Sequence, residues 1–471
     1  MIQKIVIYWF RQDLRLFDNP ALTEAAKHQS VLPIYILDDE NAGKYTMGSA
    51  SRWWLYYSLN ALNSSLNNKL SVYYGDPQNI LDDLLTRFDV EAVYWNRCYE
   101  PWRISRDVKI KKHLKSKDIA VYTYNGSLLW EPWQIKKNDG TPYKVFTPFF
   151  YRGCLNAVSP LVPKSKPEKI NCIYDQNQIG IDKLHLLPRI GWNIKLEPYW
   201  HIGEENAQNR LSVFLDEALD CYKEGRDFPD KPYTSRLSPY LHFGEISSHQ
   251  IWYAVRNRGD NHNIEHFCRE LGWREFSYSQ LYYNPTLPYQ NLQSKFDDFS
   301  WNSNITHLKA WQKGNTGIPM VDAGMRELWQ TGYMHNRVRM IVGSFLVKNL
   351  RLHWHYGERW FWDTLIDADL ANNSASWQWI AGCGADAAPY FRIFNPVTQG
   401  QKFDPEGKYI RQYIPEIADL PNKYLFNPWE CPKSILKEKQ IELGRTYPFP
   451  IVDLKVSRQS ALAAFQALKQ K

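Results

Sequence analysis

Two aspartates separated by one residue and followed by two asparagines form the most informative polar run of this 471-residue chain. The run begins at Asp367 and Asp369 and continues through Asn373 to Trp377. Paired carboxylates first suggest a metal loop, but the glycine and the final glutamate of the calcium-loop pattern are missing. If a helix starts after the aspartates, Asn373 and Trp377 lie one turn apart on one face. We therefore expect no metal, but a polar group at the aspartates and a flat group beside Asn373 and Trp377.

A second run, Arg269-Glu-Leu-Gly-Trp-Arg-Glu-Phe276, puts an acid, an aromatic plane and a cation on one helix face. Glu270, Trp273 and Arg274 are spaced at i, i+3 and i+4, the spacing of neighbours on a helix surface. Such a face could hold a nucleobase. A half-buried tryptophan with surface ion pairs would have the same pattern, so both interpretations stay open at this point.

Asn336 and Met340 form a similar pair in the run Gly332-Tyr-Met-His-Asn-Arg-Val-Arg-Met340, which opens a long apolar helix. The two residues share a face at i, i+4, and Arg337 and Arg339 add positive charge. An asparagine amide can pair with the edge of a base, as it does with adenine in DNA. Near the start of a helix, however, an asparagine is often a cap.

Hydroxyl groups and an arginine gather in Tyr233-Thr-Ser-Arg-Leu-Ser-Pro-Tyr-Leu-His-Phe-Gly244, where a helix is expected to begin. The unpaired N–H groups and the dipole of a helix start attract phosphate. An ordinary Ser or Thr N-cap would explain the same residues. The phosphate interpretation therefore depends on the other runs.

Residues 1–125 alternate short β-rich segments with segments of helical periodicity. Strands that are apolar on both faces and separated by helices indicate a parallel sheet that is covered on both sides. We therefore predict a doubly wound α/β domain. The expected strands are Lys4–Phe10, Val31–Leu37, Leu70–Gly75, Ala92–Asn96 and Ile119–Tyr124, and the expected helices are Pro20–His28, Ser51–Asn67, Ile80–Phe88 and Ser105–Ser116.

The rest of the chain has a different pattern. From Trp130 to about Trp200 prolines interrupt the chain and the periodicity fades, which predicts a long connector. Helical periodicity dominates from Glu204 to Glu416, and one more helix is expected over Leu454–Gln470. The predicted domains are residues 1–130, the α/β doubly wound parallel-sheet domain, residues 131–200, the connector, and residues 201–471, an all-helical domain.

Tryptophan is unusually frequent, and nine of the twenty tryptophans lie between Trp273 and Trp379. The seven cysteines are scattered without a Cys-x-x-Cys pair, which favours reduced thiols over a disulfide framework or a zinc site. The net charge of +7 permits an anionic partner. No apolar stretch approaches the length of a membrane span and no signal peptide opens the chain, so a soluble, cytoplasmic protein is expected.

Together with longer motifs, these runs resemble the DNA photolyases of the photolyase/cryptochrome family. The motifs follow the family's order along essentially the whole chain. They are Trp9-Phe-Arg-Gln-Asp-Leu-Arg-Leu-Phe-Asp-Asn19, Lys144-Val-Phe-Thr-Pro-Phe149, Tyr390-Phe-Arg-Ile-Phe-Asn-Pro396 and Gly400-Gln-Lys-Phe-Asp-Pro-Glu-Gly407. The resemblance implies an α/β antenna domain followed by a helical FAD-binding domain, in agreement with the predicted elements.

By this resemblance, the helical domain holds FAD in a U shape. Asp367 would pair with Arg339, and Asn373 would face the flavin N5 atom and stabilise the reduced cofactor. The positions that match the family's FAD-binding residues are Tyr222, Thr234, Ser235, Arg236, Leu237, Ser238, Phe267, Arg274, Arg339, Asp367, Ala368, Asp369 and Asn373.

The resemblance also implies a reaction, which is the light-driven splitting of cyclobutane pyrimidine dimers by an electron from excited FADH⁻. The catalytic positions that match the dimer pocket are Glu270, Trp273, Asn336 and Met340. In (6-4) photolyases the positions of Asn336 and Met340 are both His, so that lesion is not expected. Trp273 also argues against the single-strand-preferring cryptochrome branch. The runs Asn284–Pro288 and Phe296–Trp301 are most similar to class III enzymes, with class I as the alternative.

Three of the clustered tryptophans match the relay that carries an electron from the surface to oxidised flavin in this family. They are Trp301, Trp354 and Trp377. Indole suits this task because it is easily oxidised among side chains. Four further tryptophans have no assigned role and could be packing residues or an alternative relay: Trp329, Trp360, Trp362 and Trp379.

UV-damaged DNA is the implied partner of a monomeric protein, and the dimer would be flipped out of the duplex into the helical domain. Glu270 can donate a hydrogen bond to the dimer only if it is protonated, so we expect it to be buried. The DNA-binding residues implied are Glu270, Trp273 and Asn336 at the lesion, and Arg226, Arg274, Arg337, Lys348 and Arg392 facing phosphates.

The antenna chromophore is expected to be 5,10-methenyltetrahydrofolate. Folate-type class I enzymes carry a glutamate where this chain has Arg103, and Pro288-Tyr289 replaces their Cys-Lys pair. The class III resemblance implies a folate in a displaced site, and another chromophore is the alternative.

Two other functions remain open. The first is a cryptochrome-type blue-light photoreceptor without repair activity, against which the missing C-terminal extension counts. The second is a non-catalytic, aromatic-rich nucleic-acid-binding module, which the Asp367, Asp369 and Asn373 constellation disfavours.

Overall fold

The computed structural model describes residues 4–387 and 391–468. Tyr390, the first residue of one family motif, lies outside the described residues, as does Gln470 at the end of the expected last helix. The chain forms two compact units. Unit 1 comprises Met1–Asp220, Ser235–Pro285 and Ile366–Ala371, and unit 2 comprises Cys221–Thr234, Thr286–Leu365 and Asn372–Lys471.

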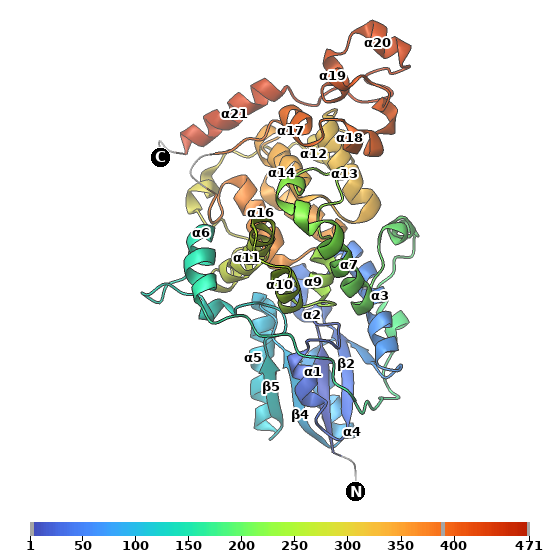
Figure 1. Ribbon diagram of the computed structural model, residues 1–471, viewed down its shortest axis with the longest axis vertical. Coiled ribbons are helices and arrows are strands. Elements are labelled where there is room, and N and C mark those ends of the chain that lie inside the picture. Colours follow the sequence, from blue (N-terminus) through green and yellow to red (C-terminus); the bar gives the residue numbers. More distant parts are fainter. Residues whose placement is uncertain (1–3, 388–390, 469–471) are drawn as a thin grey trace. The chain divides into compact units, whose positions relative to one another are not determined.

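Unit 1 contains a five-stranded parallel sheet in the order β3-β2-β1-β4-β5 (Figure 1). Strands β1 and β2 are buried along their whole length, because helices cover both faces of such a sheet. The strand order reverses between β1 and β4, which is the topological switch point of a doubly wound fold. The predicted fold is confirmed. The strands are β1 Ile5–Phe10, β2 Val31–Leu37, β3 Ser71–Tyr74, β4 Val90–Asn96 and β5 Ala120–Tyr124.

The helices between these strands agree with the predicted ones to within a few residues. They are α1 Pro20–Ala25, α3 Ser49–Ser65, α4 Pro77–Arg87 and α5 Pro101–Ser116. Trp9 and Trp95, on one face of the sheet, belong to a buried cluster with apolar side chains of α4 and α5. A further helix, α2 Asp39–Ala42, was not predicted, because one turn is too short to have a recognisable period.

The predicted connector contains only short helical turns. They are η2 Pro132–Gln134, α6 Phe146–Pro148, η3 Phe149–Gly153, η4 Cys154–Asn156, η5 Ile181–Leu184 and η6 Trp192–Tyr199. The segment nevertheless packs within unit 1, since Gln280 and Tyr283 of α11 (His262–Tyr283) donate hydrogen bonds to the carbonyl oxygens of Tyr143 and Pro132. The compact units therefore differ from the predicted division at 130 and 200, because prolines interrupt regular structure without interrupting packing.

Arg15, just after β1, joins distant segments of unit 1. It is fully buried, and its guanidinium donates to the carbonyl oxygens of Asp18 and Gly126 at 2.6 Å and of Gly244 at 2.9 Å. Gly244 has a φ of +67°, and a Cβ atom there would lie 2.1 Å from the Gln12 carbonyl oxygen. This close approach requires a glycine. The other helices of unit 1 are α7 Glu204–Glu217, α9 Ser238–Phe243 and α10 Ser248–Arg256.

Unit 2 is helical, and the described residues after β5 contain no further strand. A π-helical turn, η9 Phe345–Asn349, continues α14. The predicted helical character of the second half of the chain is thus confirmed. The helices are α8 Tyr222–Gly225, α12 Ile305–Gln312, α13 Pro319–Thr331, α14 Asn336–Ser344, α15 Trp354–Thr364, α16 Leu370–Ala381, α17 Pro396–Phe403, α18 Lys408–Tyr413, α19 Asn422–Leu425, α20 Lys433–Glu438 and α21 Leu454–Ala467. None of the described helices is long and apolar enough to cross a bilayer.

Candidate functional site

The two aspartates of the polar run meet side chains of unit 1 that are distant in the sequence. Ser238 Oγ donates a 2.6 Å hydrogen bond to Asp367 Oδ2 across 129 positions. The Tyr278 hydroxyl donates to Asp369 Oδ2, and His242 Nδ1 lies 3.8 Å from the same oxygen. Both carboxylates are buried. We call these five residues the aspartate cluster.

Electrostatics keep Asp369 ionised. Burial alone would raise the pKa of this carboxyl, but the neighbouring His242, the hydrogen bond from Tyr278 and the charge of Arg274 outweigh burial, so the pKa lies below its usual value. The cluster therefore has a fixed negative charge and oxygen acceptors at neutral pH. Within the described ranges, no group of three or more His, Cys, Asp or Glu side chains is arranged to hold a metal ion.

The hydroxyl-rich run lies where α9 begins. The N-cap of α9 is Leu237, which makes no side-chain capping bond, and the hydroxyl of Ser238 goes to Asp367 instead. The ordinary N-cap interpretation is therefore wrong. Arg236 has a left-handed φ of +54°, and its guanidinium lies 4.4 Å from the centroid of the Trp200 ring. The Ser235 carbonyl accepts from Arg210 Nε at 2.7 Å.

Three of the predicted cofactor residues of unit 1 are core residues. Leu237 is buried, and Phe267 is buried against Phe214, with 4.7 Å between the ring centroids. Ala368 is also buried between the two aspartates in the sequence. The structure therefore gives these three residues a packing role, in addition to any contact they make with a ligand.

Four predicted cofactor residues belong to unit 2, namely Tyr222, Thr234, Arg339 and Asn373. The buried Tyr222 ring has the Arg226 guanidinium 5.4 Å from its centroid. Arg339 Nε donates a 2.7 Å hydrogen bond to the Met334 carbonyl. The expected pairing of Arg339 with Asp367 stays a prediction, because Asp367 belongs to unit 1.

Asn373 is buried in α16 with its amide orientation defined. Its Nδ2 atom donates a 3.0 Å hydrogen bond to the Glu358 carbonyl oxygen, and the next residue, Ser374, donates to the Glu358 carboxylate. Because the NH₂ group is used in this way, Oδ1 is the part of the amide that can accept from a ligand. α16 begins directly after Asp369, so Asn373 and Trp377 are one turn apart, as predicted.

In unit 1, Trp273 belongs to a stack of aromatic rings. Phe146 lies face to face with its indole, with 3.8 Å between centroids and 9° between planes. Phe150 stacks in turn on Phe146 at 5.8 Å, and both phenylalanines are buried. Trp273 and Glu270 are both half-buried. The stack holds the plane of Trp273, and Glu270 is less buried than we expected.

Arg274 lies inside unit 1 and does not form an ion pair on the surface. Its guanidinium donates to the Ser127 carbonyl at 3.0 Å and to Glu275 at 3.1 Å, and it lies 5.0 Å from the centroid of the Tyr278 ring. Burial raises the pKa of Glu275 to about 7, although Arg274 and the Trp130 N–H oppose the shift. Arg274 thus links Glu275 to the aspartate cluster.

In unit 2, Asn336 is the first residue of α14 and is exposed. The N-cap is His335, whose Nδ1 atom accepts from the Arg337 N–H, so the capping alternative for Asn336 is wrong. Met340 lies one turn further on and is half-buried. Arg337 forms a 2.7 Å ion pair with Asp227, and its other amino group lies 3.9 Å from Met340 Sδ.

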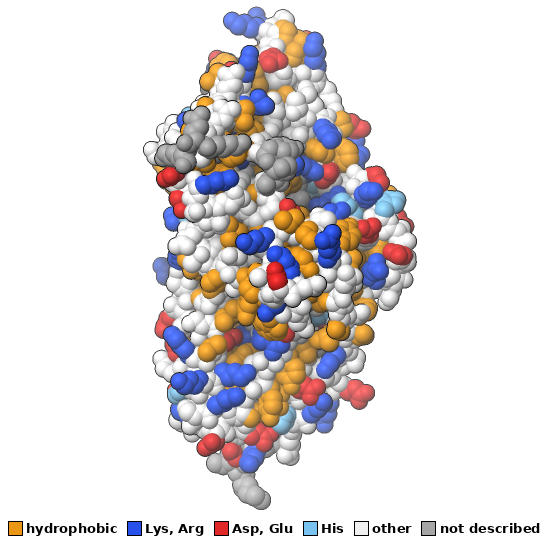
Figure 2. All heavy atoms as spheres, turned by 90° about the vertical axis from the view of Figure 1, so that its left-hand side faces the viewer, with side chains coloured by type: hydrophobic (Ala, Val, Ile, Leu, Met, Phe, Trp, Pro, Cys, Tyr) orange, Lys and Arg blue, Asp and Glu red, His pale blue; other side chains and the backbone are white. Residues whose placement is uncertain are grey.

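The predicted phosphate-facing cations have different surroundings. Arg392 is exposed, and Arg226 and Arg337 are half-buried. Lys348 was predicted to face phosphate, and this is wrong: it is buried in the π-helical turn, donates to the Ala381 carbonyl at 3.0 Å and lies over the Phe391 ring. Because the turn continues an apolar helix, the lysine side chain lies in the interior. Lys and Arg side chains are spread over the face drawn in Figure 2, with hydrophobic side chains between them.

The three predicted relay tryptophans all belong to unit 2. Trp377 and Trp354 are buried and Trp301 is half-buried. Trp377 packs against α15 at Gly357, where a Cβ atom would lie 2.1 Å from the indole. The His353 ring contacts both Trp354 and Trp301, with centroid distances of 5.6 Å and 5.0 Å. We call Trp377, Trp354, His353 and Trp301 the tryptophan chain.

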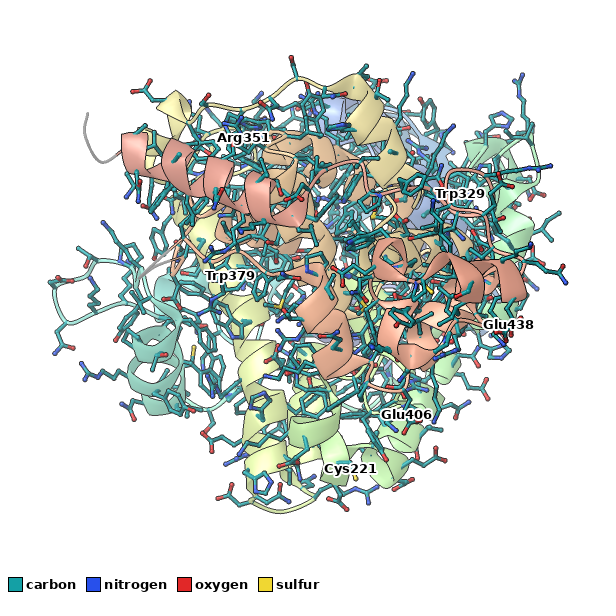
Figure 3. The ribbon with its side chains drawn as sticks, turned by 90° about the horizontal axis from the view of Figure 1, so that it is seen from above. Cys221, Trp329, Arg351, Trp379, Glu406 and Glu438 are labelled. Atoms are coloured by element: carbon teal, nitrogen blue, oxygen red, sulfur yellow. The ribbon has the colours of Figure 1, made fainter. Side chains whose placement is uncertain are left out.

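The tryptophans without an assigned role are divided between separate places in unit 2. Trp329 is 52% exposed and stacks on Trp360 with 6.3 Å between ring centroids. Trp379 Nε1 donates to the Asp386 carbonyl. Trp329 and Trp379 lie well apart in Figure 3. The described ring contacts do not join this pair to Trp379, so a second relay stays a prediction.

Several residues of the site were missed from the sequence. They are Tyr278 and His242 at Asp369, Glu358 at Asn373, Phe146 at Trp273 and His353 between two tryptophans. The i, i+4 spacing of Arg274 and Tyr278 was a usable signal for Tyr278. The other contacts join residues whose separation in the sequence follows no helical or strand period.

The chain matches two family models. Residues 6–168 match the model described as DNA photolyase, and residues 267–467 match the model described as the FAD binding domain of DNA photolyase. The second match covers most of α11 and most of unit 2, including the tryptophan chain.

Individual relatives agree with these matches. A deoxyribodipyrimidine photo-lyase from Agrobacterium fabrum is 45% identical, over 99% of this chain and 98% of that protein. Cryptochrome-2 from Arabidopsis thaliana is 37% identical, over 100% of this chain and 80% of that protein. The crystal structure of a class III photolyase from Agrobacterium tumefaciens superposes with a TM-score of 0.95 at 44% identity, covering 100% of this chain and 99% of that chain. The chain therefore belongs to the DNA photolyase family, as the sequence motifs indicated.

Proposed function

We propose that this protein is a light-dependent DNA repair enzyme, a deoxyribodipyrimidine photo-lyase, which splits cyclobutane pyrimidine dimers with reduced FAD as the electron donor. The observation that carries the proposal is the built polar cluster at Asp367 and Asp369, which is followed along the chain by the oriented amide of Asn373. No hydroxyl, thiol or amine is needed as a nucleophile. The similarity to a class III photolyase over the full chain supports the same assignment, with class III as the proposed subclass.

The residues present fit FAD. Hydroxyl and carboxylate groups of Ser235, Ser238, Asp367 and Asp369 suit the ribityl and adenosine parts, which are rich in hydroxyl and amine groups. Asn373 suits a reduced flavin, because its NH₂ group is bound to Glu358 and its free oxygen can accept the N5–H hydrogen. When bound, FAD supplies the light-excited electron donor, and the protein contributes binding, orientation and electrostatics.

Four side chains are proposed to contact the dimer. Trp273 stacks on the flipped-out bases with the face that Phe146 leaves uncovered. Glu270 and Asn336 hydrogen-bond the carbonyl edges, and Met340 packs against the methyl groups. Donors held ready in this way stabilise the negative charge that the dimer carries after it accepts an electron.

The duplex around the lesion is held by charge. Arg226, Arg337 and Arg392 are the proposed phosphate contacts, and Arg274 and Lys348 are not among them because both are held inside their units. Binding then weakens as salt is raised, with a slope set by the number of phosphates neutralised. A dimer is poorly stacked, so flipping it out costs less than flipping normal bases.

The tryptophan chain is proposed to return oxidised flavin to its active, reduced state. Burial decreases along the proposed path, from the buried Trp377 and Trp354 to the half-buried Trp301, so an electron can enter from the surface. The proposed antenna is 5,10-methenyltetrahydrofolate, and the protein is proposed to act as a cytoplasmic monomer.

One experiment tests the repair activity. An oligonucleotide with a single cyclobutane dimer is mixed with the reduced holoprotein, and recovery of the intact pyrimidine rings is measured by absorbance under blue light and in the dark. We expect recovery in the light only, and a Glu270→Ala variant should repair fewer dimers per absorbed photon. Failure to repair in light by protein that is loaded with reduced FAD contradicts the proposal.

A second candidate function is a blue-light photoreceptor, which the 37% identity to Cryptochrome-2 favours. It predicts a coloured, light-responsive flavoprotein that leaves the dimer unchanged. The same experiment thus separates the two functions.

A further inference from the structure

The ring of His353 lies between the middle and outer members of the tryptophan chain. Its centroid is 5.6 Å from that of Trp354, with planes 27° apart, and 5.0 Å from that of Trp301, with planes 63° apart. Among the described ring contacts, no pair joins Trp354 directly to Trp301. An imidazole is therefore the aromatic group through which these two indoles are connected. Any role of this imidazole in electron transfer rests on the relay, which is part of the proposed function.

Backbone contacts bring Trp301 to this position. Asn302 pairs with Leu352 as an isolated parallel bridge, and its N–H donates a 2.7 Å hydrogen bond to the Arg351 carbonyl. Arg351, labelled in Figure 3, has a left-handed φ of +52°, and its guanidinium reaches the Ser300 carbonyl and Asn302 Oδ1 at 3.5 Å and 3.3 Å. Hydrogen bonds between two chain segments thus hold Trp301 beside His353, so their approach is not a chance contact of side chains.

A second role holds the imidazole in place. His353 is the N-cap of α15, and its Nδ1 atom accepts from the His355 N–H at 3.2 Å. This bond uses the lone pair of Nδ1, so the proton of the neutral ring is on Nε2. When the ring gains a second proton, the capping acceptor is lost and a positive charge appears beside both indoles.

The charged and titratable groups around His353 come from three segments. Arg359 and His355 are on α15, Arg351 precedes the helix, and Asp297 is on the turn Ser294–Asp298. Burial, followed by the charge of Arg359, lowers the pKa of His353, and Asp297 opposes them. The imidazole is therefore neutral at neutral pH and becomes charged only in more acidic solution.

We propose that His353 gates the outer step of the tryptophan chain, so that a neutral imidazole permits electron transfer from Trp301 to oxidised Trp354 and an imidazolium blocks it. Oxidised FAD, when bound, would supply the light-driven oxidant of Trp377. In the open state, the oxidised Trp377 regains one electron from Trp354. Trp354 then regains one from Trp301, and the Trp301 radical cation releases its indole proton to water. With His353 charged, positive charge on Trp354 or Trp301 is repelled, and the hole stays on Trp377, from which it recombines.

The expected size follows from Coulomb's law. Two unit positive charges about 5 Å apart repel strongly even at an effective dielectric constant of about 20, so the population of oxidised Trp301 should fall by ~10-fold or more. The fall should occur in more acidic solution than an ordinary histidine requires, because the pKa of His353 is lowered.

Time-resolved absorption of tryptophan radicals after a light pulse tests the gate in the oxidised holoprotein. Wild type should lose oxidised Trp301 at acidic pH. His353→Asn keeps a capping acceptor without a titrating ring, and His353→Phe keeps a ring without a proton-binding site, so both should lose the pH dependence. His355→Phe is the matched comparison, because the His355 ring lies 3.9 Å from that of Trp354 and 4.6 Å from that of His353 between centroids. This variant should keep the dependence if His353 carries the charge, and a dependence that is lost in His355→Phe but kept in both His353 variants overturns the gate.

A second measurement does not depend on the flavin. The imidazole resonances of the apoprotein are followed by NMR with labelled histidine, and the His353 signal is assigned from its loss in His353→Asn. It should shift as the pH is lowered from neutral, with a midpoint below that of an ordinary histidine. A His353 signal that stays constant while the oxidation of Trp301 falls with pH overturns the gate, as does a pH dependence of Trp301 oxidation that survives in both His353 variants.

Failure of the gate and failure of the relay give different results. If wild type forms no oxidised tryptophan at any pH, the relay and the gate are both wrong. Dimer repair by chemically reduced holoprotein does not use the relay, so it would continue, and the repair function would stand. Trp377→Phe should abolish the radical signals at every pH and thereby confirms that they come from this chain.

Discussion

The carboxylates of the aspartate cluster in unit 1 and the inner tryptophans of the tryptophan chain in unit 2 are buried, but they are held by opposite means. In the cluster, Asp369 receives a hydrogen bond from Tyr278, which is far away in the sequence, and its charge depends on Arg274 and His242. In the chain, Trp354 has one polar contact, a 2.9 Å hydrogen bond from Nε1 to Asn291. Trp377 is positioned by close packing at Gly357.

The difference teaches how each part should respond to change. Directional bonds between charged groups are sensitive to the loss of any partner and to pH, because an unpaired buried charge is expensive. Packed aromatic rings are sensitive to volume and almost indifferent to pH, since rigid interiors transmit steric strain. Substitutions in the two regions test this contrast, and their expected effects range from about 4 kcal/mol to about 1 kcal/mol.

The largest effect is expected at the cluster. Asp369→Ala removes the acceptor of Tyr278 and the negative charge beside Arg274 and His242, and it should lower the free energy of unfolding by about 4 kcal/mol. Urea denaturation of the apoprotein measures this loss, and gel filtration of the holoprotein measures the accompanying loss of FAD. Tyr278→Phe removes only one donor and should cost about 1.5 kcal/mol. Equal losses in the two variants would contradict the dominant role of charge.

The next effect is a dependence on pH. Glu275 is fully buried beside Arg274, and its pKa in the folded state is raised to about 7. The folded state therefore binds this proton more tightly than the unfolded state, so stability is lost as the pH rises from about 4.5 to 7, by up to about 3 kcal/mol. Glu275→Gln should remove this share of the decline, as measured by urea denaturation at several pH values.

The control for Glu275 is an acid that makes no such contacts. Glu438, labelled in Figure 3, is exposed on α20, and Glu438→Gln should keep the wild-type slope. If Glu275→Gln declines with pH as steeply as wild type, the titration does not lie at Glu275.

At the buried tryptophans of the tryptophan chain, added volume should affect stability and pH should not. A Cβ atom at Gly357 would lie 2.1 to 2.5 Å from three atoms of Trp377, whereas at Gly343 the nearest atoms are 3.4 to 3.6 Å away. Gly357→Ala should therefore lower the free energy of unfolding by about 2 kcal/mol and Gly343→Ala by less than about 0.5 kcal/mol. Thermal denaturation at two pH values measures both, and a loss that varies with pH would break the contrast.

The smallest effect is expected at the hydrogen bond that Trp354 donates to Asn291. Asn291→Ala removes the acceptor of Trp354 Nε1 and should cost about 1 kcal/mol. Asn291→Asp keeps an acceptor at the same place and should restore most of that loss. A loss at Asn291→Ala as large as that of Asp369→Ala would mean that polar contacts hold both regions alike.

The regular parts of the molecule were predictable from the sequence, for a physical reason. Strands β1 and β2 are apolar on both faces because helices cover the sheet, so their runs mark them clearly. The helical placement of Asn373 with Trp377, and of Asn336 with Met340, followed from a local spacing that any helix obeys. The short helix α2 and the packing of the connector have no such period, and both were missed.

The residues of the site could be predicted only where the family resemblance assigned them by position. Ser238 and Asp367 could be assigned to one ligand, but their mutual hydrogen bond could not, because they lie 129 positions apart. The prediction for Lys348 was wrong because a lysine on an apolar helix is usually exposed. Here its amine is inside the protein, where it donates to the Ala381 carbonyl and lies over the Phe391 ring. Contacts of this kind depend on tertiary packing, which local pattern does not contain.

The contacts of Arg15 set a minimum time for the folding of unit 1 during synthesis. Its guanidinium is satisfied by the carbonyl oxygen of Gly244, 229 positions later in the chain. A ribosome adds about 5–20 residues per second, so at least about 10 s pass before this acceptor exists. During that interval the segment after β1 holds a cation that lacks one of its final partners, and the newly made sheet stays open to water and to chaperones. The last folding step of unit 1 therefore waits on translation, not on the sheet itself.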